Sequence, residues 1–230
     1  MIVGSGLMAS AFAPVFSAQP DAWIYAAGVS NSSCADEREF ARERRRLEAA
    51  LADAGPEPTI VYFGTCSVLD PELEDSAYVR HKLAMEAIVR ARRRHLILRL
   101  PQVAGHSTNP HTLLNYLHSR IVRSERFVVW KHARRHVVDV ADVVALARAR
   151  LDVGPAADIL HIAPEPSHPI TEIVAAFERL TGKRALFDVV ERGSAFVVDP
   201  APVVRLLARA GVDFGGDYLF RTLRRYYGQT

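Results

Sequence analysis

Three side chains that could take part in proton transfer stand within residues 65–82: the hydroxyl of Thr65, the phenol of Tyr78 and the amine of Lys82. Tyr78 and Lys82 are four residues apart, so a helix would place them one turn apart on the same face. A neighbouring ammonium favours phenolate and lowers a tyrosine pKa from about 10, toward the range useful near neutral pH. The spacing predicts a proton-transfer pair, although a Tyr and a Lys four apart also occur on many exposed helix faces.

The elements around these residues would bring them together. Residues 59–64 form a short apolar run that ends in hydroxyl side chains, as a buried parallel strand does. We expect helices over 35–54 and 76–94, the first ended by Gly55 and Pro56. The sequence therefore places Thr65 at a strand tip beside the helix that carries Tyr78 and Lys82. The first helix has a core-facing stripe of Phe40, Leu47, Ala50 and Leu51.

A glycine motif follows the first apolar residues of the chain. Residues 4–9 match the pattern G-x-G-x-x-G/A between a short strand and an amphipathic helix from about Leu7 to Ala18. Gly4 would permit a tight turn, and Gly6 would let the backbone approach a pyrophosphate at the helix N-terminus. The motif predicts a dinucleotide site, the alternative being a plain turn. No Asp or Glu ends the next strand, where an adenosine ribose would be bound.

Composition excludes several classes of protein. With 230 residues, 49% of them apolar, the chain can bury one large core with a small appendage. Its 29 basic and 26 acidic residues are too balanced for a nucleic-acid binder, while a pI near 9.0 is compatible with an anionic small molecule. Two cysteines and scattered histidines predict neither a metal site nor a disulfide framework. We expect a cytoplasmic protein without a signal peptide or membrane span.

The order of the motifs resembles the extended short-chain dehydrogenase/reductase family of nucleotide-sugar epimerases, dehydratases and ketoreductases. Thr65 lies three residues before Val68, as the family's Ser or Thr lies before its valine, although Leu69 and Asp70 replace the usual Tyr and Gly. The resemblance also covers the glycine turn, the Ala26-Ala27-Gly28 segment, the Arg99–Gly105 segment, and the segment from Arg134 to Val143 that matches the family's "R-x-F-I-H-V-D-D-V".

The resemblance implies an α/β fold: a Rossmann-like, doubly wound parallel sheet with a small C-terminal substrate lobe. Ala26-Ala27-Gly28 resembles the segment after the family's fourth strand, and residues 6–26 have room for only one helix and the start of a strand. The second and third strands are therefore expected to be missing. We place a truncated dinucleotide-binding and catalytic domain at 1–150 and the lobe at 151–230. The two helices, 35–54 and 76–94, would form a homodimer interface, the alternative being that they pack within one chain.

The resemblance also implies the site residues. Thr65, Tyr78 and Lys82 would be catalytic, and the cofactor would be NAD or NADP. The cofactor-binding residues would be Gly4, Gly6, Leu7, Met8, Ala26, Ala27, Gly28, Tyr78, Lys82, Pro101 and Val103. A nucleoside-diphosphate sugar would be bound by Thr65, Cys66, Ser67, Asn109, Asn115 and Arg135. A guanidinium suits phosphate geometry, which favours Arg135 for the diphosphate. Asp142 is expected to cap the helix that begins there.

The expected function is an NAD(P)-dependent oxidoreductase, a 4-ketoreductase of a nucleoside-diphosphate sugar in surface-polysaccharide or deoxysugar biosynthesis. A dehydratase of this family would carry an Asp-Glu pair after the threonine, where this chain has Cys66 and Ser67. Two alternatives stay open at this point. One is a nucleotide-sugar 4-epimerase, and the other is a non-catalytic sugar-nucleotide-binding relative that has lost normal dinucleotide binding.

Overall fold

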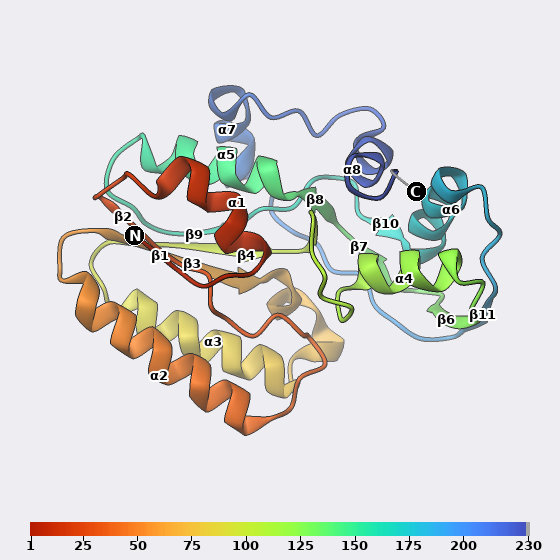
Figure 1. Ribbon diagram of the computed structural model, residues 1–230, viewed down its shortest axis with the longest axis horizontal. Helices are drawn as coiled ribbons and strands as arrows, with labels where there is room; N and C mark the ends of the chain where they lie inside the picture. The colour runs from red at the N-terminus through yellow and green to blue at the C-terminus, as the bar shows by residue number, and fades with distance from the viewer. Residues whose placement is uncertain (229–230) are drawn as a thin grey trace.

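A parallel five-stranded sheet lies at the centre of the computed structural model, which describes residues 1–228 (Figure 1). Its order is β1-β2-β3-β4-β9, and every neighbouring pair is parallel. The longest pairing joins β3 to β4, from Ile60 opposite His95 to Thr65 opposite Leu100. The strands are β1 (Ile2–Val3), β2 (Ala22–Tyr25), β3 (Thr59–Thr65), β4 (His95–Leu100) and β9 (Ala157–His161).

Helices cover both faces of this sheet, which explains why β3 and β4 are apolar on both sides. On one face lie α1 (Leu7–Phe16), α5 (Val140–Leu151) and α7 (Ala201–Ala210), and on the other α2 (Glu37–Ala54) and α3 (Ala77–Arg90) (Figure 1). We call the packing on the α1 side the first core and that on the α2 side the second core.

The second core contains the apolar stripe of α2 that the sequence indicates. Leu47, Ala50 and Leu51 pack there with Met85 and Val89 of α3 and with side chains of the sheet. These stripes are therefore buried within one chain, and a homodimer through α2 and α3 stays a prediction.

Strand β1 is the edge of the sheet, and this confirms the expected Rossmann-like fold without its second and third strands. Ile2 and Val3 pair with Ile24 and Tyr25 of β2 on one side. In the sheet that the structure describes, no strand pairs with the other side of β1. A dinucleotide-binding sheet of the usual order continues past its first strand, and the crevice for the ligand lies where the order reverses. Here one wall of that crevice is absent from residues 1–228.

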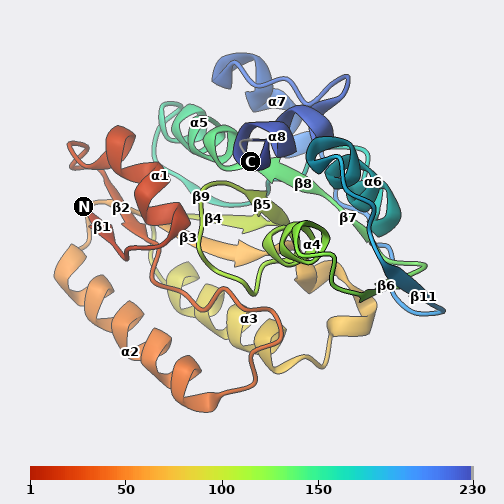
Figure 2. The same ribbon diagram turned by 45° about the vertical axis from the view of Figure 1, so that its right-hand side comes forward.

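A smaller lobe stands beyond the carboxyl ends of the strands (Figures 1 and 2). Its helices α4 (Leu113–Val122), α6 (Ile170–Thr181) and α8 (Tyr218–Tyr227) enclose a lobe core that includes Leu117, Phe177 and Leu223. This core draws on residues from both sides of residue 150. The lobe has two small sheets. One pairs β6 (Phe127–Trp130) with β11 (Phe187–Val190), and the other pairs β7 (Arg134–Arg135) with β10 (His168–Pro169). A third small sheet, beside the lobe, pairs β5 (Gln102–Ala104) with β8 (Val137–Asp139).

One helix start differs from the expectation. The N-cap of α5 is Asp139, whose carboxylate accepts a hydrogen bond from the backbone N–H of Ala141 at 2.8 Å. Asp142 instead lies in the first turn and accepts a hydrogen bond from the Tyr218 hydroxyl at 2.5 Å. The prediction that Asp142 caps this helix was therefore wrong. As to membranes, the helices of residues 1–228 are all too short or too polar to cross a bilayer.

Candidate active site

The end of β3 and the first two turns of α3 place Thr65, Tyr78 and Lys82 together. Thr65 is the last residue of β3 and caps the short 3-10 helix η1 (Cys66–Leu69), accepting a hydrogen bond from the N–H of Ser67 at 3.1 Å. Tyr78 and Lys82 face the same side of α3, with Lys82 Nζ 5.9 Å from the centre of the Tyr78 ring. All three residues are buried.

Tyr78 is held in its protonated form. Burial raises the pKa of its phenol, and the negative charge of Glu43 raises it further, while a contact with the Thr65 side chain lowers it by less. The expected lowering by Lys82 is therefore not found, because Lys82 is itself paired with a carboxylate. Tyr78 is therefore a phenol at neutral pH in this structure.

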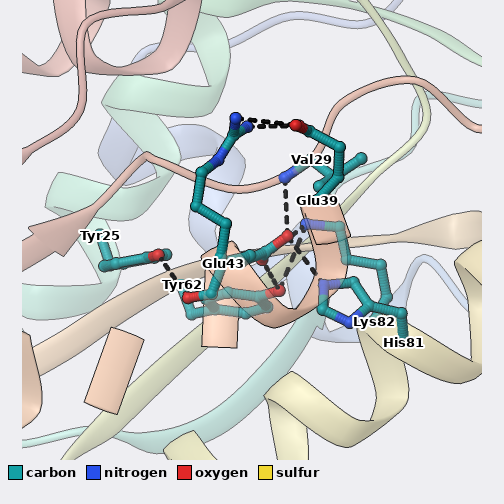
Figure 3. Close-up of polar contacts among 8 residues, drawn as sticks. Tyr25, Val29, Glu39, Glu43, Tyr62, His81 and Lys82 are labelled. Carbon is teal, nitrogen blue, oxygen red and sulfur yellow. Dashed lines mark hydrogen bonds and ion pairs between the residues drawn. The ribbon is translucent and has the colours of Figure 1, made fainter. Parts of the chain in front are cut away.

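Lys82 is buried beside a carboxylate that the sequence analysis did not select. Its Nζ donates hydrogen bonds to Glu43 Oε1 and to the Tyr62 hydroxyl, both at 3.2 Å (Figure 3). Burial lowers the pKa of Lys82, and the charge of Glu43 opposes this shift. An ammonium has three donors, so one N–H of Lys82 has no partner among these contacts.

Glu43 comes from α2 and is 1% exposed. Its Oε2 accepts hydrogen bonds from the backbone N–H of Val29 at 2.7 Å and from His81 Nε2 at 2.9 Å. Burial alone would raise the pKa of Glu43, but the His81 hydrogen bond, the charge of Lys82 and the bonds from Val29 and Tyr62 outweigh it and bring the pKa to about 2. Glu43 is therefore ionised at neutral pH.

A signal for Glu43 was present in the sequence. It lies three residues after Phe40 and four before Leu47, which is the spacing of the buried stripe of α2. A lone acid within an apolar stripe indicates a buried charge with partners. The arginines on both sides of it, Arg42 and Arg44, give the same stretch the look of an exposed charge run.

The glycine turn is tight at Gly4 and open at Gly6. Gly4 adopts φ +128°, and a Cβ there would come 2.4 Å from the carbonyl oxygen of Ala26, so β1 can approach β2 this closely only with glycine. Gly6 is the N-cap of α1, and a Cβ added to it would meet no atom within 4 Å. The backbone at Gly6 is therefore open toward the space in front of the helix.

That space is a cleft of about 840 Å³ between the sheet and the lobe. It is lined by Ser5, Gly6 and Leu7, by the segment 105–108 and Pro110, by the face of α4 with Asn115 and Arg123, and by Tyr226. Thr65, Tyr78, Lys82 and Arg135 lie outside this lining. The structure thus brings the turn together with one predicted substrate residue, Asn115, and the proton-transfer residues are not part of this cleft's wall.

The remaining predicted cofactor residues lie around the same carboxyl ends of the strands. A Cβ on Gly28 would come 2.7 Å from Lys82 Nζ and 2.9 Å from Glu43 Oε1, so Gly28 lies directly against that pair. Leu7 packs over Gly105. Met8, Ala26 and Val103 are half-buried at the edge of the first core, Ala27 borders the second core, and Pro101 separates β4 from β5.

The predicted substrate residues are mostly engaged with the protein itself. Asn115 donates to the carbonyl oxygens of Ser107 and Asn109 and accepts from the Tyr227 hydroxyl at 2.7 Å. Asn109 donates to Ser30 Oγ at 3.0 Å, which joins the loop after β2 to the loop before α4. The contacts give both asparagines a structural role, and their role in substrate binding stays a prediction.

Arg135 and the residues after Thr65 are similarly enclosed. The Arg135 guanidinium donates to the carbonyl oxygens of Arg134 and Ser194 and lies 3.8 Å from Asp70 Oδ2. Burial lowers the pKa of Arg135, and Asp70 opposes this shift. Cys66 is buried, and burial raises the pKa of its thiol to about 12, so it is no nucleophile here. Ser67 is half-buried, and its substrate contact stays a prediction.

Comparison with protein families gives a match over most of the chain. The sequence model of the NAD dependent epimerase/dehydratase family matches residues 4–163. Among curated proteins, no sequence matches this chain.

Solved structures share the fold at low sequence identity. RMD from Pseudomonas aeruginosa, complexed with NADPH, is 18% identical with a TM-score of 0.69, over 99% of this chain and 88% of its own. UDP-glucose 4-epimerase from Thermus thermophilus, complexed with NAD, is 17% identical with a TM-score of 0.71, over 97% and 83%. WbmH from Bordetella bronchiseptica, in complex with NAD+, is 20% identical with a TM-score of 0.70, over 96% and 80%.

Proposed function

The chain belongs to the NAD dependent epimerase/dehydratase family, and on that premise we propose that it is a 4-ketoreductase of a nucleoside-diphosphate sugar. The family consists of NAD(P)-dependent enzymes of the short-chain dehydrogenase/reductase type that act on nucleotide sugars. The choice among reductase, epimerase and dehydratase rests on this chain's own residues.

The observation that carries the proposal is the burial of the Tyr78 phenol beside a Lys82 ammonium that is paired with Glu43. Burial and the charge of Glu43 both raise the pKa of this phenol. A ketoreductase needs a proton donor at the sugar oxygen, whereas an epimerase must begin by removing a proton from a hydroxyl. The buried phenol already carries the proton that reduction needs, and we take this as support for the reductase.

The residues fit one half of a dinucleotide cofactor. The open backbone at Gly6 can accept a phosphate at the N-terminus of α1, and the third N–H of Lys82 can donate to the nicotinamide ribose. Gly28, in the loop after β2, lies against Lys82 Nζ, and a contact of Val103 with the cofactor stays a prediction. On the adenosine side the sheet ends at β1, so no neighbouring strand supplies a carboxylate for that ribose within residues 1–228.

The reaction that follows needs few protein groups. When bound, the reduced nicotinamide supplies the hydride, with its two electrons, to the carbonyl carbon of the sugar. Tyr78 donates its hydroxyl proton to the carbonyl oxygen as the π bond breaks, which leaves an alcohol and a phenolate. Thr65 donates a hydrogen bond to the same oxygen and orients it. The phenolate takes a proton back from solvent before the next turnover.

Two other reactions of the family have less support. A 4,6-dehydratase needs an acid and a base after the threonine, and Cys66 and Ser67 supply neither. A 4-epimerase must retain its cofactor through two hydride transfers. An adenosine side without a flanking strand suits release of the spent cofactor after each turnover instead.

The test is calorimetric titration of the purified protein with NADH and NADPH, followed by assay with 4-keto nucleoside-diphosphate sugars. We expect micromolar binding and reduction that consumes one cofactor per sugar. Tyr78→Phe should keep cofactor binding and lower kcat by about 10²–10⁴-fold. Co-purified NAD⁺ together with reversible epimerisation would overturn the reductase in favour of the epimerase.

A second candidate is a non-catalytic protein that binds a sugar nucleotide. It is favoured by one observation, the position of β1 at the edge of the sheet. If the folded protein binds neither NADH nor NADPH but still binds a nucleoside-diphosphate sugar, this candidate replaces the enzyme.

A further inference from the structure

The Glu43 carboxylate accepts as many hydrogen bonds as its oxygens can hold. An ionised carboxylate offers about four acceptor positions and no donor. Tyr62 and Lys82 fill those of Oε1 at 2.8 and 3.2 Å, and the Val29 N–H and His81 Nε2 fill those of Oε2 at 2.7 and 2.9 Å (Figure 3). His81 must therefore carry its hydrogen on Nε2. The site is built around a charged Glu43, and a neutral acid would break one of these bonds.

The four partners come from three segments that border the proposed site. Tyr62 belongs to β3, which ends at Thr65, and His81 and Lys82 belong to the first turns of α3 after Tyr78. Val29 follows Gly28 in the loop after β2, and the Tyr25 hydroxyl donates to the backbone carbonyl of Glu43 at 3.0 Å. Glu43 thus joins α2, α3, β2 and β3 at the place where they meet the site.

These contacts fix the direction in which Lys82 points. One donor goes to Glu43 Oε1, and a second goes to the Tyr62 hydroxyl, which itself donates to Glu43. Gly28 lies against Nζ on another side, where a Cβ added to Gly28 would come 2.7 Å from that atom. The ammonium is therefore confined between β3 and the Gly28 backbone, and its remaining N–H is the one left for a ligand.

Glu43 also changes the field at Tyr78. A lone ammonium 5.9 Å from the ring centre would favour phenolate. A carboxylate 3.2 Å from that ammonium offsets its charge, so the tyrosine lies beside an ion pair rather than beside a cation. The raised pKa of Tyr78, caused by burial and next by Glu43, agrees with this arrangement.

We propose that Glu43 is a positioning residue of this site: as the buried counter-ion of Lys82 it holds the ammonium between Tyr62 and Gly28, and it leaves Tyr78 a proton donor. The assignment rests on the proposed reductase activity, since it explains how the site is prepared for reduction. Glu43 does this through Lys82, without touching the reacting atoms.

A second buried ion pair provides a matched comparison. Glu86 lies four residues after Lys82 on α3 and is 2% exposed, and it pairs with Arg99 through hydrogen bonds of 2.6–3.2 Å. It is as buried as Glu43, and its partner Arg99 is on β4. If Glu43 only stabilised the fold, removing its charge and removing that of Glu86 would have the same effect on the ionisation of Tyr78.

The experiment follows the ionisation of Tyr78 directly. We would label the tyrosines with ¹³C at Cζ, assign Tyr78 among the seven signals with Tyr78→Phe, and titrate wild type, Glu43→Gln and Glu86→Gln. The charged or titratable groups around the site are Glu43, Lys82, His81 and Glu86, with Tyr25, Tyr62 and Cys34. We expect Tyr78 to ionise at least about one pH unit lower in Glu43→Gln, a tenfold change in its ionisation constant, and to be unchanged in Glu86→Gln.

A conservative variant and a measurement on the wild type keep the test decisive if Glu43→Gln unfolds. Glu43→Asp keeps the charge, so Tyr78 should titrate as in wild type. The chain has only three lysines, Lys82, Lys131 and Lys183, so the ¹⁵Nζ signal of Lys82 in the native protein can be assigned, and it should be that of an ammonium at pH 7.

The outcomes separate this inference from the proposed function. Equal Tyr78 shifts in Glu43→Gln and Glu86→Gln, a shift in Glu43→Asp as large as that in Glu43→Gln, or a neutral Lys82 amine would overturn the role of Glu43. If NADH and NADPH both fail to bind the wild type, the reductase is excluded whatever the titration gives. If either one binds and Tyr78 does not shift, only the role of Glu43 is excluded.

Discussion

Glu43 and Lys82, 39 residues apart in the sequence, meet at 3.2 Å in a place where both side chains are buried. Such a pair is costly to desolvate, and either partner alone would be an uncompensated charge in the interior. The stability of the fold and the chemistry of the proposed site therefore depend on the same contact.

The first prediction concerns this pair. Lys82→Met should lower the free energy of unfolding by about 3–5 kcal/mol, because it leaves the Glu43 charge buried and unpaired. Adding Glu43→Gln to Lys82→Met should recover part of that loss. Urea unfolding of the four proteins of the double-mutant cycle measures both effects. Strictly additive losses would show that the two side chains do not interact.

The second prediction concerns acid. The pKa of Glu43 is about 2 in the folded protein against a usual value of 4.5, so its charged form stabilises the fold. A group whose pKa is lowered on folding gives its full stabilisation above the unfolded pKa and loses it as the pH falls toward the folded one. The free energy of unfolding of wild type should therefore exceed that of Glu43→Gln by a constant amount above about pH 5. This difference should shrink between about pH 4.5 and 2.

Urea unfolding of both proteins at several pH values checks this. Glu86→Gln is the control for removal of a buried carboxylate. An excess that stays constant down to pH 3 would contradict the ionised, fully bonded Glu43 of the structure.

The third prediction concerns two glycines with opposite surroundings. Gly6→Ala adds a methyl group in open space, so the unfolding free energy should fall by no more than about 1 kcal/mol, from the lost N-cap preference. Its methyl would point at a bound phosphate, so NADH should bind at least about tenfold more weakly, a change of about 1.4 kcal/mol. Thermal unfolding and calorimetric titration separate the two effects.

Gly28→Ala is the contrasting variant. Its methyl would lie 2.7 Å from Lys82 Nζ, so the ion pair must shift, and we expect a loss of stability of about 1–3 kcal/mol as in other overpacked sites. If Gly6→Ala binds NADH as tightly as wild type, the turn contacts no phosphate.

The fourth prediction concerns the choice of cofactor. The 2′-phosphate of NADPH is distinguished by residues after the second strand of a complete dinucleotide fold, and this sheet ends at β1. NADH and NADPH should therefore bind with dissociation constants within about threefold, or about 0.7 kcal/mol, of each other. Competition titration measures the ratio, and a preference of a hundredfold or more would reveal an adenosine site outside the sheet.

The sequence alone was enough to predict the parallel sheet and the position of the proposed catalytic residues. Apolar runs and glycine or proline breaks marked β3, α2 and α3, because these signals act over a few residues. The shortage of residues between Gly6 and Ala26 was enough to predict the missing strands. The Tyr78–Lys82 spacing on a helix followed from helical geometry alone.

What the sequence could not predict depends on contacts between distant segments. The partners of Glu43 come from residues 25–29, 62, 81 and 82, and no local pattern links them. The same holds for Asn115, whose amide is engaged by Tyr227 far along the chain. For α5, Asp139 and Asp142 are both acids near a helix start, and only the backbone geometry selects Asp139 as the cap.

The route of the chain between its cores has a consequence for folding. The first core takes residues from α1 near the start of the chain, then α5 and β9, and it is completed only by Val203, Leu206 and Val212. The residues between these segments, within 104–137 and 170–187, belong to the lobe core instead. During synthesis, the part of the first core that α7 covers, beside α5 and β9, must therefore stay exposed to water until residues 201–212 have emerged. Such sequence-distant contacts slow folding and leave apolar surface open to aggregation, so a chain stopped after β9 should accumulate as aggregates rather than as a smaller folded protein.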